Sequence, residues 1–196
     1  MRKNIWFLLL VSIYLLLTAC AAPQTQDPIR QAGQAQAAST EDGAVVAIVN
    51  GEEITQKQFE DAYRLQVAFF EANRALYGYE GEFPDEETYL QSMIELRVCL
   101  QEAERLGLEP TQAQMDEYFA EADAIMEDSD EEAVQAMNAY LEGIGMDPKT
   151  YRETTETKVV RETILLGNLA MHAAQNGEEW EGYKAALLEK AQIERP

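Results

Sequence analysis

The sequence of 196 residues has little positive charge: 15 lysines and arginines stand against 36 aspartates and glutamates, and the formal net charge is −21. Proteins that bind nucleic acids need clustered cations, which release counterions from the phosphate backbone. The shortage of basic residues therefore predicts that nucleic acid is not a partner of this chain. The hydrophobic content of 46% is ordinary for a folded domain, so wholesale disorder is not expected.

Residues that bind metals or act as nucleophiles are also scarce. His172 is the only histidine, which excludes a site with several histidine ligands, and no serine lies in a strand–turn–helix elbow that could complete a triad with it. Cys20 and Cys99 are too few for a disulfide framework or a four-thiolate centre. Without a second thiol nearby, Cys99 is expected to be a small buried hydrophobe. The sequence predicts no metal, no cofactor and no catalytic residue.

Acidic residues are concentrated in residues 106–148, which contain twelve carboxylates and no lysine or arginine. Asp128, Asp130 and Glu132 have the 1, 3, 5 spacing of a calcium loop, but alanine occupies the sixth and twelfth positions, where glycine and glutamate belong. The calcium loop is therefore rejected. We expect this span to be a solvated, solubilising face, and the alternative is a docking surface for basic clients or weakly bound divalent ions.

The chain begins with a segment that is typical of exported proteins. Arg2 and Lys3 precede a mostly apolar run over residues 5–17, and a Leu-Thr-Ala-Cys sequence then ends at Cys20. As a helix this run rises about 20 Å, short of the ~30 Å hydrocarbon core, so it is expected to be a signal peptide. Its ending resembles the lipobox of bacterial lipoproteins, which implies cleavage before Cys20 and a diacylglycerol on that thiol. The alternative is an uncleaved signal anchor that extends to Ala22, and both place the rest of the chain outside the cytoplasm.

These features predict three segments: a signal peptide over residues 1–19, a lipidated cysteine with a flexible linker over 20–43, and one domain over 44–196. Loss of the signal peptide leaves 13 basic and 36 acidic side chains, a charge of −23, so an anionic membrane surface would repel the chain and the anchor must be hydrophobic. The linker is rich in alanine and glutamine with almost no large apolar residue, and it would reach about 25 Å as a flexible coil.

The domain opens with a predicted β-hairpin. A β-branched run over residues 44–49 ends at Asn50-Gly51, a pair that tolerates positive φ, and a short second strand would reach Ile54. Thr55 and Gln58 have the spacing of a capping box, which predicts a helix from there to about Tyr77.

Capping residues and apolar periodicity predict five further helices. We expect four of them over residues 84–106, 111–126, 130–142 and 147–175. The last follows Asn176-Gly177 and presents Trp180, Tyr183, Leu187 and Leu188, before a strand edge near Ile193. The predicted fold is therefore mainly α, with about six helices and a small β element.

Four segments of the domain carry a resemblance to SurA-like and PrsA-like extracytoplasmic chaperones. They are Val49 to Thr55 with Phe59, Glu102 to Leu108 with Thr111, Gly143 with Asp147-Pro148 and Tyr151, and Trp180 with Tyr183, Leu187 and Ile193. The resemblance covers nearly all of residues 44–196. This part of the chain is similar also to the peptide-holding arms of trigger factor. In that family the N-terminal strand and the C-terminal return lie together, which implies that Val45–Val49 pairs with Gln192–Glu194.

One departure from the family bears on catalysis. In isomerase-bearing relatives a parvulin domain sits between the long helix and the C-terminal return, whereas only Asn176-Gly177 separates them here. The resemblance therefore implies a chaperone part without isomerase activity, and the chain is not expected to be an enzyme.

Aromatic residues gather at the end of the first predicted helix and in the loop that follows. Phe69, Phe70, Tyr77, Tyr79 and Phe83 are the residues that we expect to contact clients, because aromatic and methionine side chains adapt to many partners. The alternative for most of them is plain core packing. The sequence predicts a membrane-tethered holdase for unfolded, newly exported polypeptides; the alternatives are an adaptor lipoprotein that binds one envelope partner and an isomerase with an unrecognised site.

Overall fold

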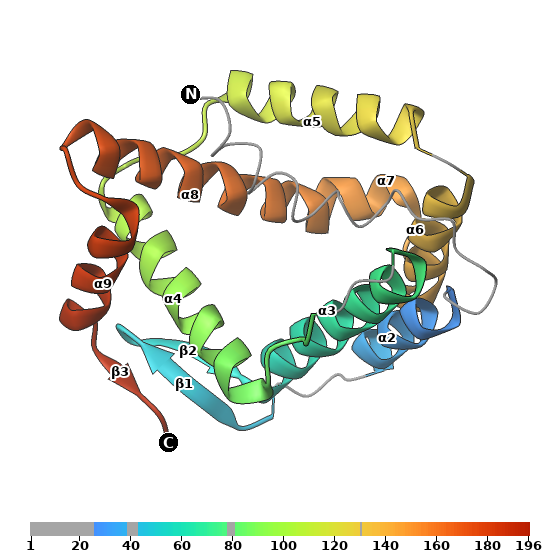
Figure 1. Ribbon diagram of the computed structural model, residues 1–196, viewed down its shortest axis with the longest axis horizontal. Helices are drawn as coiled ribbons and strands as arrows, with labels where there is room; N and C mark the ends of the chain where they lie inside the picture. The colour runs from blue at the N-terminus through green and yellow to red at the C-terminus, as the bar shows by residue number, and fades with distance from the viewer. Residues whose placement is uncertain (1–25, 39–42, 78–80, 130) are drawn as a thin grey trace. The chain divides into compact units, whose positions relative to one another are not determined.

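The computed structural model describes residues 26–38, 43–77, 81–129 and 131–196 (Figure 1). Its helices and strands form two compact units, each built from three separated stretches of chain. Unit 1 comprises the described parts of Met1–Glu41, Glu60–Phe83 and Tyr118–Thr157, and unit 2 those of Asp42–Phe59, Pro84–Glu117 and Lys158–Pro196. The single domain expected over 44–196 contains unit 2 from residue 44 onward but leaves out the first stretch of unit 1.

Unit 2 contains the predicted sheet. Strands β1 (Val45–Val49) and β2 (Glu52–Thr55) form an antiparallel hairpin, whose turn residues Asn50 and Gly51 have φ of 51° and 89°. Strand β3 (Ile193–Glu194) pairs with the other edge of β1, with Val49 opposite Ile193. The sheet order β2-β1-β3 confirms the pairing of the N-terminal strand with the C-terminal return.

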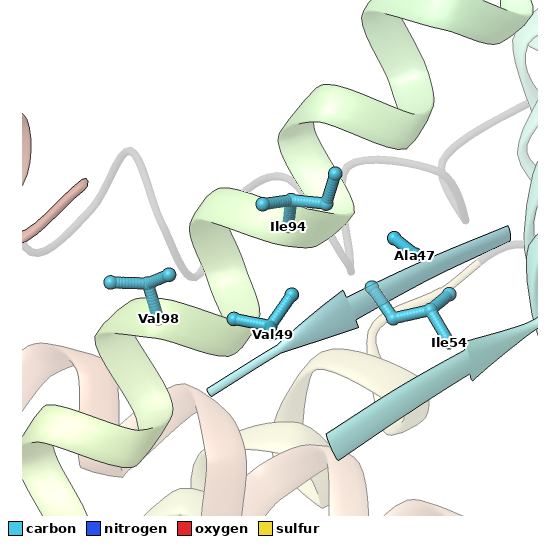
Figure 2. Packing of buried hydrophobic residues seen from close by; sticks show 5 residues of the cluster. All are labelled: Ala47, Val49, Ile54, Ile94 and Val98. Atoms are coloured by element: carbon cyan, nitrogen blue, oxygen red, sulfur yellow. The ribbon is translucent and has the colours of Figure 1, made fainter. Parts of the chain in front are cut away.

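The sheet is covered by helix α4 (Glu86–Arg105), which presents Ile94 and Val98 to it (Figure 2). These side chains meet Ala47 and Val49 of β1 and Ile54 of β2, and all five are nearly or fully buried. Burial of a branched aliphatic side chain contributes about 1.5–3 kcal/mol, so this cluster holds the hairpin against α4.

A second cluster of unit 2 joins α4 to helices α8 (Thr157–Gln175) and α9 (Trp180–Lys190). Cys99 and Ala103 of α4 are buried against Leu165 and Leu169 of α8. Side chains of α9 complete the cluster from one side; they are Trp180, Tyr183 and Leu187. Leu187 also contacts the sheet cluster, so α9 links the two parts of the unit 2 core.

The helix starts follow the predicted caps. Thr55 and Gln58 bond reciprocally, backbone to side chain, at 3.1 and 3.3 Å at the start of α3 (Gln56–Tyr77). Thr111 and Gln114 do the same, at 2.9 and 3.3 Å, at the start of α5 (Gln112–Glu127). The Asp147 carboxylate accepts two backbone N–H bonds at 3.0 Å ahead of Pro148, the first residue of α7 (Pro148–Tyr151). Each cap satisfies donors that would otherwise lack partners.

Unit 1 contains a helix where the sequence predicts a flexible linker. Helix α2 (Gln26–Ala38) packs along α6 (Glu131–Ile144), and Ile29 is only 2% exposed (Figure 1). A Cβ added at Gly33 would lie 3.0 Å from the Tyr140 carbonyl oxygen, and one at Gly143 would lie 2.4 Å from the Arg30 carbonyl oxygen. The prediction of a flexible linker is therefore wrong for residues 26–38. Small residues let the backbones of α2 and α6 approach closely, so one large apolar residue is enough to dock α2 on α6.

The same close approach explains an error at the end of α6. The sequence predicts that Gly143 ends this helix, but Gly143 lies inside it and its missing side chain makes room for α2. The left-handed residue is Gly145, with φ of 69°, and the Met146 amide donates to the Leu141 carbonyl at 3.0 Å. Both glycines are thus needed, the first for packing and the second for the helix end.

The longest predicted helix is interrupted after its first turn. A π-helical turn over Arg152–Glu156 separates α7 from α8, where one uninterrupted helix is predicted. The Thr157 amide and hydroxyl both donate to the Arg152 carbonyl, the hydroxyl at 2.6 Å. This wider turn is the kind of irregularity that often marks a functional position.

Candidate functional site

Three of the aromatic residues near the end of α3 form a cluster in unit 1. The Phe83 ring lies 5.4 Å from that of Phe70 and 5.5 Å from that of Tyr63. All three side chains are half-buried, so each combines ring packing with partial access to solvent. We call Tyr63, Phe70 and Phe83 the aromatic cluster. Sequence reasoning found Phe70 and Phe83 but missed Tyr63, which the helical spacing of seven residues from Phe70 places on the same face.

The structure separates Phe69 from Phe70. Successive helix residues point about 100° apart, and Phe69 faces Tyr140 at 6.3 Å, where it joins the unit 1 core. Tyr140 in turn lies 5.9 Å from Tyr151. Phe69 and Phe70 therefore lie on different faces of α3, and their contact with clients stays a prediction. Tyr79 and the side chain of Tyr77 lie outside the residues that the structure describes.

The face of unit 1 that α2 covers is rich in aromatic and flexible apolar side chains. Ile29 of α2 contacts a buried cluster with Ala136 and Tyr140. Partly buried side chains surround this cluster: Leu65, Phe69, Met137, Ile144 and Tyr151. Aromatic and methionine side chains fill irregular space and tolerate different partners. Sequence reasoning missed this face because it treated residues 26–38 as a linker.

Unit 2 contains a pocket of about 370 Å³ beside the β1–β2 turn. Its apolar wall consists of Val98, Leu187 and Ala191, and its polar rim of Asn50, Gln101, Glu102, Arg105 and Lys190. Asn50 fixes one side of the rim, since its amide donates to Gln101 at 2.8 Å and accepts from the Gln192 backbone at 2.8 Å. Gln101 in turn donates to the Val49 carbonyl at 3.0 Å. No motif in the sequence pointed to this pocket.

Two of the charged groups at the pocket rim, Glu102 and Arg105, form an ion pair. Arg105 donates two hydrogen bonds to the Glu102 carboxylate, at 2.6 and 2.8 Å. These bonds lower the pKa of Glu102 below its ordinary value, and Lys190 adds a smaller effect in the same direction. The Tyr183 hydroxyl donates to the same carboxylate, and partial burial raises the pKa of this phenol. Glu102 therefore stays ionised at neutral pH, which suits it to binding rather than to proton transfer.

The two residues weighed for nucleophilic chemistry have structural surroundings. Cys99 is buried in the unit 2 core, where desolvation raises the pKa of its thiol to about 11. A thiol with so high a pKa is a poor nucleophile at neutral pH. His172 lies one helical turn from Asn176, with 3.0 Å between the imidazole Nε2 and the amide nitrogen.

The acidic residues of the span 106–148 are predicted to form a solvated face, and the part of this span that the structure describes agrees with that prediction. Its described carboxylates are all exposed, and several bind arginines of the long helix region. Asp123 accepts two hydrogen bonds from Arg152, at 2.5 and 3.0 Å, while the same guanidinium lies 5.1 Å from the Phe119 ring centre. Among the described residues, no group of three or more His, Cys, Asp or Glu side chains has the geometry to hold a metal ion.

None of the helices in the described part of the chain combines the length and the apolar character that a membrane crossing requires. The predicted signal peptide and Cys20 lie outside the described residues.

Comparison with known families decides the identity of the fold. The sequence pattern of the SurA-like N-terminal domain matches residues 1–165. The chain belongs to the SurA-like N-terminal domain family. This confirms the resemblance and the mainly helical fold with a small sheet. No curated protein and no solved structure matches the chain significantly.

The SurA-like N-terminal domain is a non-catalytic module of chaperone-type proteins, and it binds polypeptides in general. The match begins before α2, so the family pattern includes the stretch that the sequence predicts to be a signal peptide and a linker. Residues 166–196 lie outside the match, and within the structure they supply the end of α8, α9 and β3, which complete the core of unit 2.

Proposed function

We propose that this protein is a membrane-tethered holdase outside the cytoplasm, which shields apolar segments of unfolded exported polypeptides without catalysing a reaction. The observation that carries the proposal is the aromatic cluster of unit 1. The Phe83 ring lies 5.4–5.5 Å from the other two rings, and all three are half-buried, in a member of a chaperone-type family. Partly exposed aromatic rings bind apolar segments of many sequences because they offer area without demanding fixed hydrogen bonds.

The charge of the chain supports the same function. A holdase must keep apolar surface exposed without aggregating, and a formal net charge of −21 supplies the required mutual repulsion. The described acidic residues of the span 106–148 are exposed, so they hydrate the protein around its apolar surfaces.

The proposed tether is a diacylglycerol on Cys20. Helix α2 starts at Gln26, so only five residues separate it from the anchor, and a fully extended chain of this length spans about 20 Å. The start of α2 would therefore stay within about 20 Å of the membrane surface, where exported polypeptides emerge. Cys20→Ala is expected to abolish lipid labelling and lipoprotein-type cleavage; labelling that persists in this variant would disprove the tether.

The junction between α8 and α9 is too short to contain an isomerase domain. In the structure α8 ends at Gln175 and α9 begins at Trp180, so four residues join the long helix to the return segment. A pocket that lowers the barrier of ~20 kcal/mol to proline isomerisation needs far more chain than that. Prolyl isomerisation measured with the purified protein is expected at the background rate.

The holdase proposal is tested with the full-length chain in lipid nanodiscs and several unrelated denatured clients. Aggregation is followed by light scattering with and without the chaperone. We expect protection that falls when Phe70 or Phe83 is changed to serine. Phe119→Ser is the matched control, since it removes an equally half-buried ring of unit 1 outside the aromatic cluster. Absence of protection for every client would disprove the holdase.

A structural or adaptor lipoprotein is the second candidate, and the pocket of unit 2 favours it. Its rim groups are held by hydrogen bonds among Asn50, Gln101 and Gln192, and such fixed polar groups suit one specific partner. Crosslinking in cells separates the two candidates: many unrelated polypeptides indicate a holdase, and one stoichiometric partner indicates an adaptor.

A further inference from the structure

We infer that the face of unit 1 covered by α2 is a helix-binding groove, which α2 occupies within its own chain and which takes helical segments of client polypeptides. We call it the α2 groove; its residues are Leu65, Phe69, Ala136, Met137, Tyr140, Ile144 and Tyr151. The inference rests on the proposed function, because it assigns a binding surface to the proposed clients.

The fit of α2 defines what the groove accepts. Ile29 fills it and is 2% exposed, and Ala32 and Gly33, three and four residues later, lie on the same helix face at 5% exposure or in full burial. At Gly33 an added Cβ would come within 3.0 Å of the Tyr140 carbonyl oxygen and 3.1 Å of the Gly143 Cα. The groove therefore selects a helix with one large aliphatic residue followed by small residues at positions i+3 and i+4.

The groove itself has the composition of an adaptable site. Two tyrosines, a phenylalanine and a methionine surround the place of Ile29, and Tyr140 lies between Phe69 and Tyr151 at ring distances of 6.3 and 5.9 Å. Such side chains can repack around a different aliphatic residue with little loss of contact. A client helix does not need the sequence of α2, only its pattern of large and small residues.

α2 depends on its docking for its own folding. Among the residues that the structure describes, Ile29 is the one large side chain that α2 buries. The polar contacts of α2 include the ion pair of Arg30 with Glu142 at 3.2 Å and the hydrogen bond that Gln36 accepts from the Tyr140 hydroxyl at 3.2 Å. A helix of 13 residues with an internal glycine is not stable alone in water. α2 therefore folds only while it is docked, as a segment that competes with other occupants would.

The first test measures binding in the full-length chain in nanodiscs. The probe is a fluorescent synthetic peptide of residues 26–38, and its affinity is read by anisotropy. Ile29→Asp in the chain is expected to release α2 and raise the apparent affinity about tenfold, as follows if the groove is free in about a tenth of wild-type molecules. Gln34→Asp, the same charge on the exposed face of α2, is the matched control and should change nothing.

A charge exchange locates the peptide. Glu142→Arg in the Ile29→Asp chain is expected to weaken the peptide, and a peptide carrying Arg30→Glu is expected to recover the affinity. Gly33→Leu in the chain is a second way to release α2, should Ile29→Asp fail to fold. Unchanged affinity in both released variants, or no recovery in the charge exchange, would overturn the inference.

The last arm links the groove to clients and separates the two proposals. Ile29→Asp is expected to increase protection of denatured clients, and the free peptide of residues 26–38 is expected to reduce it again. If wild type protects clients but neither change has an effect, the α2 groove is not the client site and the holdase proposal stands. If no variant protects any client, the holdase proposal fails and the groove has no client role.

Discussion

The cores of the two units are built from different side chains. The six largest fully buried side chains all belong to unit 2: Val49, Ile54, Ile94, Val160, Leu165 and Leu169. The buried residues of unit 1 are mostly alanine and tyrosine, with Ile29 and Leu141 as its buried aliphatics. Full burial of a large branched aliphatic side chain contributes about 1.5–3 kcal/mol, whereas alanine has little apolar area to bury. We conclude that, among the described residues, unit 2 contains most of the large aliphatic burial that stabilises the fold.

A pair of leucine substitutions tests this contrast most strongly. Leu165→Ala, at 0% exposure among the aliphatics of unit 2, is expected to lower the free energy of unfolding by about 3–5 kcal/mol. Leu141→Ala, at 5% exposure in unit 1, should cost about 2–3 kcal/mol, since fewer large aliphatic side chains are buried in that unit. Urea denaturation measures both. Equal losses would remove the distinction between the units.

Removal of the C-terminal return is expected to weaken unit 2 and spare unit 1. Deleting residues 189–196 takes away β3, the contact of Ala191 with the sheet cluster, and the ion pair of Arg195 with Glu87. The loss should be about 2 kcal/mol, with faster hydrogen exchange in β1 and unchanged exchange in α6. Ile193→Ala alone should cost little, since that side chain is 37% exposed. An unchanged melting temperature after the deletion would contradict the role of the sheet.

Substitutions at the hairpin turn separate backbone shape from side-chain bonding in unit 2. Asn50→Gly keeps the left-handed φ of 51° but loses the bonds to Gln101 and Gln192, at a cost of about 1 kcal/mol. Asn50→Ala should cost more by roughly a further 1 kcal/mol, because alanine disfavours that backbone region. Thermal unfolding of the two variants measures the difference, and a less stable glycine variant would contradict this order.

The smallest effect is a pH dependence in unit 1. Hydrogen bonds from Arg152 hold the pKa of Asp123 below its ordinary value of 3.8. A carboxylate with a lowered folded pKa stabilises the protein above its unfolded pKa, and the contribution disappears as pH falls through the folded pKa. Asp123→Asn should therefore lower the urea midpoint at pH 7, and by progressively less as pH falls below the unfolded value of 3.8. Asp128→Asn, on an exposed residue at the end of α5, is the control and should give no such difference.

Local sequence patterns predicted most of the elements. Five of the six predicted helices and the hairpin are present, and the sixth is divided by the π-helical turn. The helix starts could be recognised because caps such as Thr55, Thr111 and Asp147 act over a few neighbouring residues. The pairing of β1 with β3 followed from the family resemblance, since no local pattern joins such distant residues.

What the sequence did not reveal depends on contacts between distant segments. α2 has too few large apolar residues for a periodic signal, and its stability comes from a close approach to Gly143 more than a hundred residues away. For the candidate site, the aromatic composition pointed to Phe70 and Phe83, but only the structure separates them from Phe69. The pocket of unit 2 combines residues from three elements, so its parts are dispersed along the chain.

The placement of β3 affects how the protein is made. β1 is the middle strand of its sheet, and β3 covers one of its edges. Next to this pairing the Gln192 amide donates to the Asn50 side chain, and these two residues are 142 positions apart in the sequence. While the intervening chain is synthesised, that edge of β1 has no β3 to cover it, and uncovered edges recruit other strands. The sheet therefore closes only when the last strand arrives, and the yield of the protein should depend on factors that cover the β1 edge until then.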